Sequence, residues 1–357
     1  MSAPDRPLIT LAIRHYNNAA FVAEALAAAF AQTYSPLEIV FIDDASTDGG
    51  WEIAQRLIEN YRGPHRIVVA RNPTRLGVGG QYDRVRELAK GEIFVFADAD
   101  DISLPQRCQR IHEAFRDGGA ELLGVISHYD IIASDGTPFI ELPSGFGAAR
   151  VDAAEWTAED LAHERSGPSG AAAAFRRTVF ELGTPLTGLQ HSEDLICGFR
   201  CLLRGRLATI PEVLLHRRAH LNNLSGPIHP EWGGSQLAAW VAKTLRAKVL
   251  IPGVMKRDIA LFEGYGMISP SRATTLRHEI MLHARSLKLL RISTRGGLGT
   301  ALHAYSVLRK GGLSLRLSAR LVLQTSLPSI AMIFLRRNPL IRARGKMKSE
   351  RPTPSLS

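Results

Sequence analysis

Three carboxylates follow an apolar run within four residues of one another. The segment Gly91–Asp101 contains the β-rich stretch Ile93–Ala97 and then Asp98, Asp100 and Asp101. Open α/β sheets bind ligands outside the carboxyl ends of their strands, so this strand would deliver hard oxygen ligands to a binding position. Mg²⁺ and Mn²⁺ take carboxylate oxygens together with substrate phosphates. The spacing indicates a divalent-cation site, although a solvated acidic turn is the common structural interpretation.

Other polar residues stand at the ends of predicted elements. Residues 14–18 follow the first predicted strand, residues 43–49 follow the second, and Glu193 and Asp194 begin a helix. In a parallel sheet such strand ends converge on one crevice. Tyr16 offers a flat face to a nucleobase, and a carboxylate can accept the ring N–H of uracil or guanine. A carboxylate on the opposite side can take a proton from an acceptor hydroxyl.

Strand and helix patterns alternate through the first 130 residues. The strand patterns are Leu8–Ile13, Leu37–Ile42, Arg66–Ala70, Ile93–Ala97 and Glu121–Ser127. The helical patterns are Phe21–Ala31, Asp48 to about Asn60, Gln81–Lys90 and Pro105–Arg116. This alternation implies βαβ units and an α/β fold with a mostly parallel sheet. The pattern is less regular from 130 to 230, where a helix is predicted around 193–204.

The composition is that of a globular protein, but its charge is uneven. The chain has 357 residues, of which 45% are hydrophobic and 22% charged, with a net charge of +10. Residues 235–357 hold 22 Lys and Arg against 4 Asp and Glu, or +18, which leaves −8 for residues 1–234. A basic C-terminal region of this kind is typical of segments that meet an anionic surface.

We place a domain boundary at Gly233-Gly234. Residues 1–233 form the predicted α/β domain, 234–345 a basic, mostly helical region, and 346–357 a disordered tail. The apolar run Leu321–Leu335 is too short and polar to span a membrane comfortably. Its flanking arginines suit an interfacial anchor on anionic lipid, and a helical subdomain packed on the α/β domain is equally consistent. Few aromatics and no known motif argue against nucleic acid as a partner.

Cysteine usage and the N-terminus predict the compartment. Cys108, Cys197 and Cys201 make no disulfide framework, which fits a reducing compartment. The first residues contain no apolar stretch of the kind found in signal peptides. We therefore expect a cytoplasmic protein, peripheral at the inner face of the plasma membrane if the basic region binds lipid.

A series of short motifs occurs in a fixed order along residues 8–225. They are Tyr16-Asn17, Gln32-Thr33-Tyr34, Asp43-Asp44-x-Ser-Thr-Asp, Ala89-Lys90-Gly91-Glu92, Asp98-Ala99-Asp100-Asp101, Phe175-Arg176-Arg177, Glu193-Asp194 and Arg218-Ala219-His220-Leu221-Asn222-Asn223-Leu224-Ser225. Each fragment is weak, but the ordered series is specific. Over this range the chain resembles a family 2 glycosyltransferase with the GT-A fold, a Rossmann-like sheet flanked by helices.

The resemblance implies a metal-dependent, inverting sugar transfer from a nucleotide-sugar. Its acceptor would be a glycan or a lipid-linked saccharide, as in polysaccharide biosynthesis for the cell envelope. By position, Tyr16 and Asp44 would hold the base and Asp98 would contact the nucleotide. Asp100 would ligate Mn²⁺ or Mg²⁺, and His220 would lie near the metal and diphosphate.

The resemblance also assigns the acceptor side and leaves one residue unexplained. Asp194 would be the general base, and Glu193 beside it would share the catalytic position or cap its helix. Arg14-His15 departs from the family, which often has Pro-Thr or Pro-Ser at these two positions before the tyrosine. Arg14 could add a phosphate contact on the donor side or line the crevice. Asp43 is expected to be structural.

Three other classes of protein were weighed. An oxidoreductase is excluded, because Gly77-Val78-Gly79-Gly80 does not continue to a dinucleotide-binding motif. Tyr82 stands where that motif needs Gly or Ala. A nucleotidyltransferase would need a glycine-rich loop after the first strand, and residues 14–18 contain no glycine. The remaining alternative is a non-catalytic nucleotide-sugar-binding or assembly module that keeps the fold, against which the intact Asp100 and Asp194 argue.

Overall fold

The structure, a computed structural model, describes residues 6–138, 156–162, 168–220 and 248–293. The chain groups into two units. The first comprises Met1–Ile132, Ala148–Arg218 and Leu250–Ile280, and the second comprises Ala133–Gly147, Ala219–Val249 and Met281–Ser357. The first unit contains the sheet and every predicted site residue except His220.

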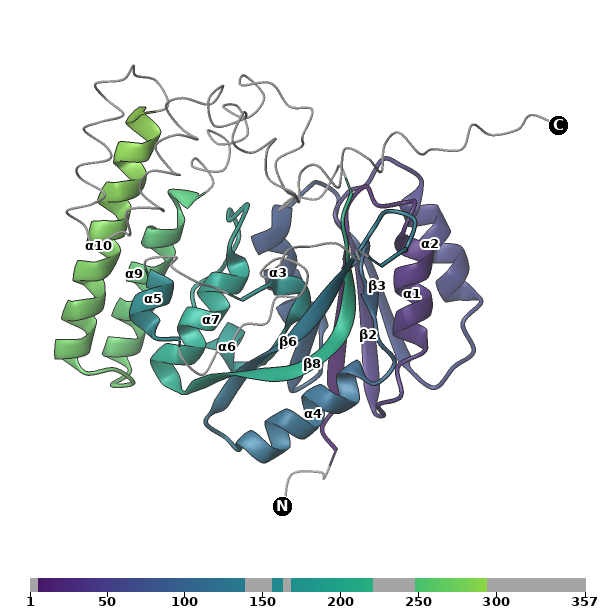
Figure 1. The fold of residues 1–357 in the computed structure, drawn as a ribbon, viewed down its shortest axis with the longest axis horizontal. Coiled ribbons are helices and arrows are strands. Elements are labelled where there is room, and N and C mark those ends of the chain that lie inside the picture. The colour runs from purple at the N-terminus through teal and green to yellow at the C-terminus, as the bar shows by residue number, and fades with distance from the viewer. Residues whose placement is uncertain (1–5, 139–155, 163–167, 221–247, 294–357) are drawn as a thin grey trace. The chain divides into compact units, whose positions relative to one another are not determined.

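An eight-stranded sheet forms the centre of the first unit (Figure 1). Its strands are β1 (Ile9–His15), β2 (Leu37–Asp43), β3 (Arg66–Arg71), β4 (Ile93–Asp98), β5 (Ile102–Ser103), β6 (Leu122–Ile132), β7 (Ala173–Arg176) and β8 (Arg206–Arg218). The strand order is β3-β2-β1-β4-β7-β6-β8-β5. Strands β1 to β4 pair in parallel, and so do β6 and β8, whereas β7 and β5 run antiparallel to their neighbours. The mostly parallel α/β sheet expected from the sequence is confirmed.

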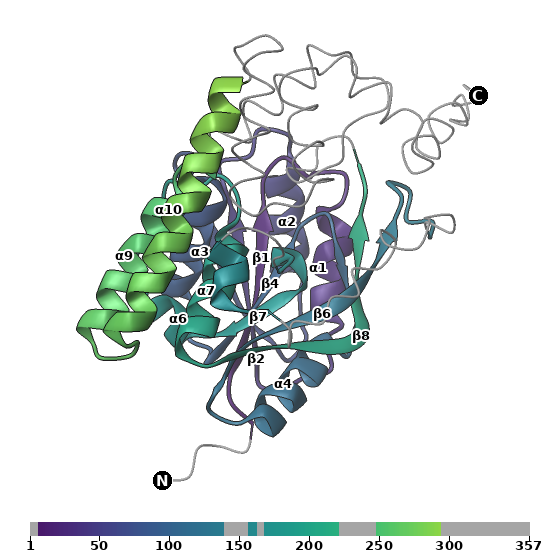
Figure 2. The ribbon, with the colours of Figure 1, turned by 60° about the vertical axis from the view of Figure 1, so that its left-hand side comes forward.

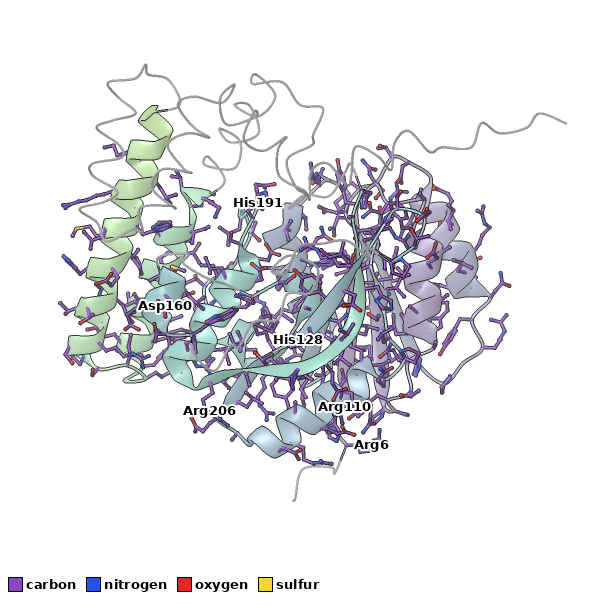
Figure 3. All side chains as sticks on the ribbon, in the orientation of Figure 1. Arg6, Arg110, His128, Asp160, His191 and Arg206 are labelled. Atoms are coloured by element: carbon purple, nitrogen blue, oxygen red, sulfur yellow. The ribbon has the colours of Figure 1, made fainter. Side chains whose placement is uncertain are left out.

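The parallel strands share one direction in the figures. Arg6, just before β1, and Arg206, the first residue of β8, both lie at the lower side of the view in Figure 3. The carboxyl ends of β1 and β8 therefore lie at the opposite, upper side, where the sequence places the polar residues.

Helices cover both faces of the sheet. They are α1 (Val22–Phe30), α2 (Gly50–Glu59), α3 (Gly77–Leu88), α4 (Arg107–Gly118), α5 (Ala158–Ala162), α6 (Thr178–Glu181), α7 (Glu193–Arg204), α9 (Ile251–Gly264) and α10 (Pro270–Ser293), with a 3₁₀ turn η2 (Gly170–Ala172). One apolar cluster joins the sheet to α1, α2 and α4, and another joins it to α3, α6, α7 and α9. The sheet runs between α6, α7 and α9 on the left of Figure 1 and α1 and α2 on the right.

The alternation of side chains decides which face each polar strand end occupies. In β1, Leu11 and Ile13 pack with α1 and α2, whereas Ala12 packs with the α3 and α7 cluster. Because successive side chains point to opposite faces, Arg14 continues the Ala12 row. Asp98 continues the row of Phe96 in β4 in the same way, and Arg14 and Asp98 are partners in the register of β1 and β4.

Helix α3 begins four residues earlier than the predicted Gln81. Its first turn is rich in glycine because the helix packs closely against the segment before α7. A Cβ on Gly79 would lie 2.1 Å from the carbonyl oxygen of Leu186. The backbone N–H groups of Leu76 and Gly77 are bound by the carboxylate of Asp44, which is distant in sequence. Helical periodicity alone does not reveal such a cap.

Helix α9 packs within the first unit. It lies beside α7 (Figure 2). Its buried side chains, which include Ile251, Met255 and Phe262, join the same apolar cluster as those of α7. The boundary predicted at Gly233-Gly234 and the disordered tail predicted for 346–357 lie outside the described residues. Within the described part of the chain, no helix combines the length and apolar character needed to cross a membrane.

Candidate active site

The three predicted metal-binding carboxylates lie together at the end of β4. One carboxylate oxygen from each of Asp98, Asp100 and Asp101 lies within 4.8 Å of the others. Asp100 and Asp101 are buried, and Asp98 is partly exposed. Burial and the neighbouring Asp100 raise the pKa of Asp101 well above its usual range, and Asp98 adds to this effect. Crowded carboxylates of this kind are stabilised by a cation, and their hard oxygens fit Mg²⁺ or Mn²⁺.

Arg218, at the end of β8, holds the acidic turn. Its backbone N–H donates to the Asp101 carboxylate over 2.8 Å, and its Nε donates to the Asp100 carbonyl oxygen over 3.0 Å. Its Nη2 pairs with Glu24 of α1 at 2.7 Å. The side chain is nearly fully buried. Arg218 begins one of the sequence motifs, but its role in fixing the aspartates was not predicted. Its place in a motif at a strand end was the available signal.

Arg14 connects this turn to α7. Its Nη2 lies 2.5 Å from Asp98 Oδ1 and its Nη1 lies 3.4 Å from Glu193 Oε1. The guanidinium also lies over the ring of Tyr82, 4.8 Å from the centroid. Burial alone would lower the pKa of Arg14, but Asp98, Tyr82 and Glu193 together outweigh this effect and raise the pKa. The structure thus directs Arg14 towards two carboxylates, and its predicted donor contact stays a prediction.

Glu193 and Asp194 form the first turn of α7 and differ in their surroundings. Glu193 is buried, whereas Asp194 is partly exposed and accepts N–H bonds from Gly170 (2.8 Å) and Leu195 (2.7 Å). Burial, with the adjacent Asp194, raises the pKa of Glu193 to about 8. Burial also raises the pKa of Asp194, but its two backbone donors oppose the shift. Because N–H donors favour the ionised form, Asp194 is the better base of the pair.

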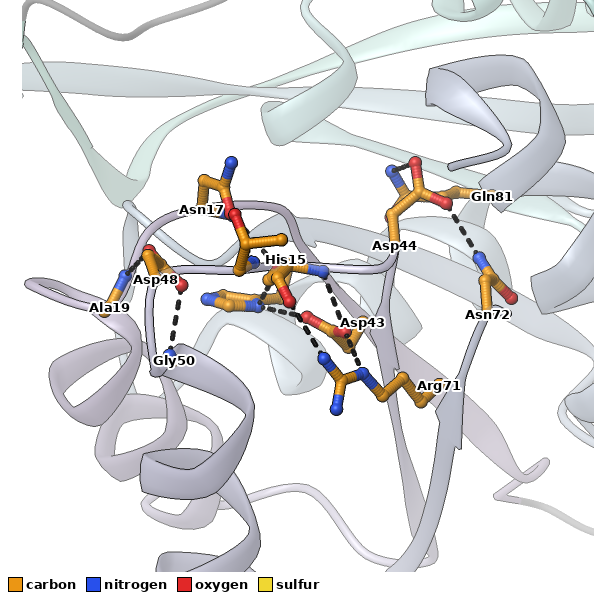
Figure 4. A network of polar contacts seen from close by, with 12 residues as sticks. His15, Asn17, Ala19, Asp43, Asp44, Asp48, Gly50, Arg71, Asn72 and Gln81 are labelled. Carbon is orange, nitrogen blue, oxygen red and sulfur yellow. Dashed lines mark hydrogen bonds and ion pairs between the residues drawn. The ribbon is translucent and has the colours of Figure 1, made fainter. Parts of the chain in front are cut away.

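Asp44 is fully buried and its oxygens are engaged (Figure 4). Oδ1 accepts from Asn72 Nδ2 (2.9 Å) and the Leu76 N–H (2.8 Å). Oδ2 accepts from the Gly77 N–H (2.9 Å) and Gln81 Nε2 (3.4 Å). A carboxylate offers about four acceptor positions, so the described residues already use them. Asp44 therefore orders the loop between β3 and α3, and its predicted contact with a base stays a prediction.

Asp43 is part of a separate buried network (Figure 4). Its Oδ1 lies 2.8 Å from His15 Nδ1, and its Oδ2 accepts the Ser46 N–H over 3.1 Å and pairs with Arg71. His15 packs so closely on Gly50 that a Cβ there would lie 2.4 Å from the imidazole ring. These contacts fit the expectation that Asp43 is structural.

Tyr16 follows β1 and is half-buried. The guanidinium of the exposed Arg75 lies over its ring, 3.9 Å from the centroid. The ring of Tyr16, which was predicted to lie on the donor side, is thus paired with the Arg75 cation. Its role in holding a base is not tested by these contacts.

His220 belongs to the second unit, directly after Ala219. Its position relative to the aspartates is therefore not defined, and its predicted place near the metal stays a prediction. The other predicted site residues all belong to the first unit.

The sheet and its flanking helices form a GT-A fold, the fold of a large class of glycosyltransferases. Residues 10–182, just under half of the chain, match the model of glycosyl transferase family 2, which supports assigning this part of the chain to that family.

Similar proteins agree with this assignment. An uncharacterized glycosyltransferase, alr2836 from Nostoc, is 31% identical over 59% of this chain and 65% of its own length. The UDP-Glc:α-D-GlcNAc-diphosphoundecaprenol β-1,3-glucosyltransferase WfaP of Escherichia coli is 31% identical over 26% of this chain and 36% of its own. The mannosyltransferase PcManGT of Pyrobaculum calidifontis, solved with GDP-Man and Mn²⁺, has a TM-score of 0.51 at 19% identity, covering 94% of this chain and 89% of its own. The chain thus spans less than two thirds of the length of these two sequence relatives.

Proposed function

We propose that this protein transfers a sugar from a nucleoside-diphosphate donor to an acceptor hydroxyl, with inversion at the anomeric carbon. The observation that carries the proposal is the connection made by Arg14. It contacts Asp98 of the acidic turn and Glu193 at the start of α7, next to the partly exposed Asp194. A cation-binding cluster and a base joined by one side chain suit a displacement between a diphosphate and an incoming hydroxyl.

The metal would be held by the aspartates after β4. Asp100 would be its main ligand. Asp98 would contact the nucleotide, and His220 would lie near the metal and the diphosphate. A bound Mn²⁺ or Mg²⁺ would neutralise the charge of the diphosphate leaving group. The mutual spacing of Asp98, Asp100 and Asp101 supports this assignment, and the presence of Mn²⁺ with GDP-Man in the similarly folded mannosyltransferase agrees with it.

Asp194 would act on the acceptor side. The acceptor oxygen attacks the anomeric carbon while Asp194 takes its proton, and the bond from that carbon to the diphosphate oxygen breaks. A single displacement of this kind inverts the configuration. Glu193 lies beside Asp194 in the first turn of α7 and contacts Arg14.

The donor base would lie near Tyr16, with Asp44 shaping the adjoining loop. Tyr16 supplies a ring face beside the Arg75 guanidinium. The Asp44 carboxylate accepts hydrogen bonds from the backbone N–H groups of Leu76 and Gly77, so it would fix the loop beside the bound base. A direct contact between Asp44 and the base requires that one of its present hydrogen bonds be exchanged.

The acceptor class proposed is a glycan or a lipid-linked saccharide at the cytoplasmic face of the membrane. The glucosyltransferase WfaP is named for a diphosphoundecaprenol-linked acceptor. The net charge of +18 in residues 235–357 would suit a peripheral contact with anionic lipid.

A donor screen tests the proposal. The full chain is incubated with UDP-, GDP- and other nucleotide-sugars, with Mn²⁺, Mg²⁺ or chelator, and released nucleoside diphosphate is measured. We expect metal-dependent release from one donor, increased by the correct acceptor, and an inverted anomer in the product by NMR. Tight donor binding without release under any condition would instead identify a non-catalytic nucleotide-sugar-binding module.

A further inference from the structure

Arg14 is a buried cation between two carboxylates that belong to different parts of the first unit. Its side chain is 5% exposed. Asp98 stands at the end of β4 and Glu193 at the start of α7, far apart in the sequence. Arg14 therefore joins the strand of the proposed donor side to the helix of the proposed acceptor side.

The guanidinium rests on a fixed aromatic platform. Its carbon lies 4.8 Å from the centroid of the Tyr82 ring and 5.7 Å from that of Phe96. The two rings stack on each other with centroids 3.9 Å apart. A cation over a buried ring is held by the electrostatic field of the ring as well as by its ion pairs, so Arg14 has little freedom to turn elsewhere.

The first turn of α7, which contains Glu193 and Asp194, packs close to the Arg14 side chain and the Tyr82 ring. A Cβ on Gly170 would lie 3.1 Å from the Tyr82 hydroxyl, 3.4 Å from Glu193 Oε1 and 3.5 Å from Asp194 Cβ. The Gly170 N–H itself donates to Asp194. One packed group therefore contains Glu193, Asp194 and the aromatic platform. A substitution that moves Glu193 would also move Asp194.

Both Nη groups of Arg14 are occupied by carboxylates. Nη2 contacts Asp98 and Nη1 contacts Glu193, while Nε is buried without a hydrogen-bond partner among the described residues. A side chain engaged in this way is arranged to hold two protein groups at a set separation. A lysine is a point charge and cannot reproduce the planar, two-sided contact.

We propose that Arg14 is a positioning residue: it clamps Asp98 to Glu193 and so sets the distance between the bound donor and Asp194. This inference rests on the proposed transferase function and replaces the phosphate contact predicted for Arg14. It also explains why an arginine stands at a position where the resembling family often has Pro-Thr or Pro-Ser. Both of its carboxylate partners lie in the family motifs that this arginine connects.

The test compares Arg14→Gln and Arg14→Lys with Glu193→Gln and the double variant Arg14→Gln/Glu193→Gln in the full chain. The control is Arg84→Gln, which breaks an exposed ion pair with Glu87 on α3. Thermal unfolding, donor affinity by calorimetry, and kcat for transfer are measured for each. Arg84→Gln should match the wild type in all three.

We expect Arg14→Gln to lower kcat on the order of 100-fold, because small misplacements of reacting groups cost that much. Donor affinity should change little. The double variant should lose less than the product of the two single losses, because both residues act through one contact. Arg14→Lys should also lose kcat while keeping the Tm of the wild type, which separates positioning from folding if Arg14→Gln does not fold.

Two results would overturn the proposal. A loss of donor affinity with unchanged kcat in either variant would make Arg14 a donor ligand. Unchanged kcat and affinity in Arg14→Lys, together with full additivity in the double variant or an unfolded Arg14→Gln, would make it merely structural. Failure of the proposed function is distinct, because the wild type would then turn over no nucleotide-sugar.

Discussion

Arg200 of α7 and Asp258 of α9 form a fully buried ion pair. Arg200 Nε lies 2.8 Å from Asp258 Oδ2, and the two side chains are 1% and 0% exposed. Asp258 also accepts from the N–H and hydroxyl of Thr184, in the segment before α7. A region predicted from sequence to lie beyond the α/β domain therefore supplies a core contact to the helix that begins with Glu193.

Asp258→Asn should strongly destabilise the protein. Removing one partner leaves Arg200 buried without its counter-charge, which costs about 3–5 kcal/mol. Urea unfolding of the full chain measures this change. The matched control on the same helix is Glu263→Gln, which breaks a partly exposed pair with Arg277 and should cost about 0–1 kcal/mol. Equal small effects for both variants would contradict the structural role of the pair.

Asp100→Ala should abolish turnover and metal-dependent nucleotide binding while the fold is kept, because it removes a strand-end ligand and little apolar surface. Calorimetry with nucleoside diphosphate and Mn²⁺, alongside thermal unfolding, checks both parts. Asp117→Ala, which removes an exposed carboxylate on α4, is the control. Full activity of Asp100→Ala, or of the wild type in excess chelator, would disprove the metal role.

Asp194→Asn should lower kcat by ~100-fold or more, because the amide cannot accept the proton of the acceptor hydroxyl. Donor affinity should be close to that of the wild type, since Asp194 is assigned to the acceptor side in the proposed function. Steady-state kinetics and donor calorimetry separate the two effects, with the exposed Glu181→Gln as control. A large loss of donor binding at near-normal kcat would mean that Asp194 is assigned to the wrong side.

Glu193 should make stability depend on pH. Its pKa is raised from 4.5 to about 8 in the folded protein by burial and by Asp194. The folded state therefore holds a proton that the unfolded chain releases, so this contribution is complete below about pH 4.5 and is lost as the pH rises to about 8. Unfolding free energies of the wild type should fall relative to those of Glu193→Gln across this range. Parallel curves for the two proteins would contradict the shift.

The basic C-terminal region should bind anionic lipid. The full chain should pellet with vesicles that contain anionic lipid, and raised salt should weaken the binding because charges are screened within ~10 Å at 0.1 M. Each basic residue near such a surface contributes about 1 kcal/mol.

Two truncations distinguish a lipid anchor from a packed region. A chain ending at Ser293 keeps α9 and α10 and should fold without binding vesicles. A chain ending at Gly234 loses Asp258 and should be insoluble or unfolded. Full-length protein that stays in solution with anionic vesicles at low salt would remove the membrane proposal.

Sequence patterns predicted strands β1 to β4 and β6 and the polar residues that follow β1, β2 and β4, but they did not predict β5, β7 and β8. Runs such as Ile39–Ile42 and Ile93–Ala97 are apolar throughout because parallel strands are buried on both faces. Because parallel strands end at the same edge, Arg14 and Asp98 were expected near one another, and they form an ion pair. The place of each residue at the end of an apolar run in the sequence was enough for this prediction.

What the sequence could not decide is which partner each polar side chain takes. Asp44 binds the start of α3, Arg14 joins Asp98 to Glu193, and Asp258 neutralises Arg200. These contacts join residues that are far apart in the sequence. The helical and strand periodicities of the sequence do not predict them. They arise only when packing excludes water, because a buried charge must then find its partner within the protein. Tertiary structure therefore determined how the polar residues are connected, whereas the sequence by itself determined where the strands end and which residues stand there.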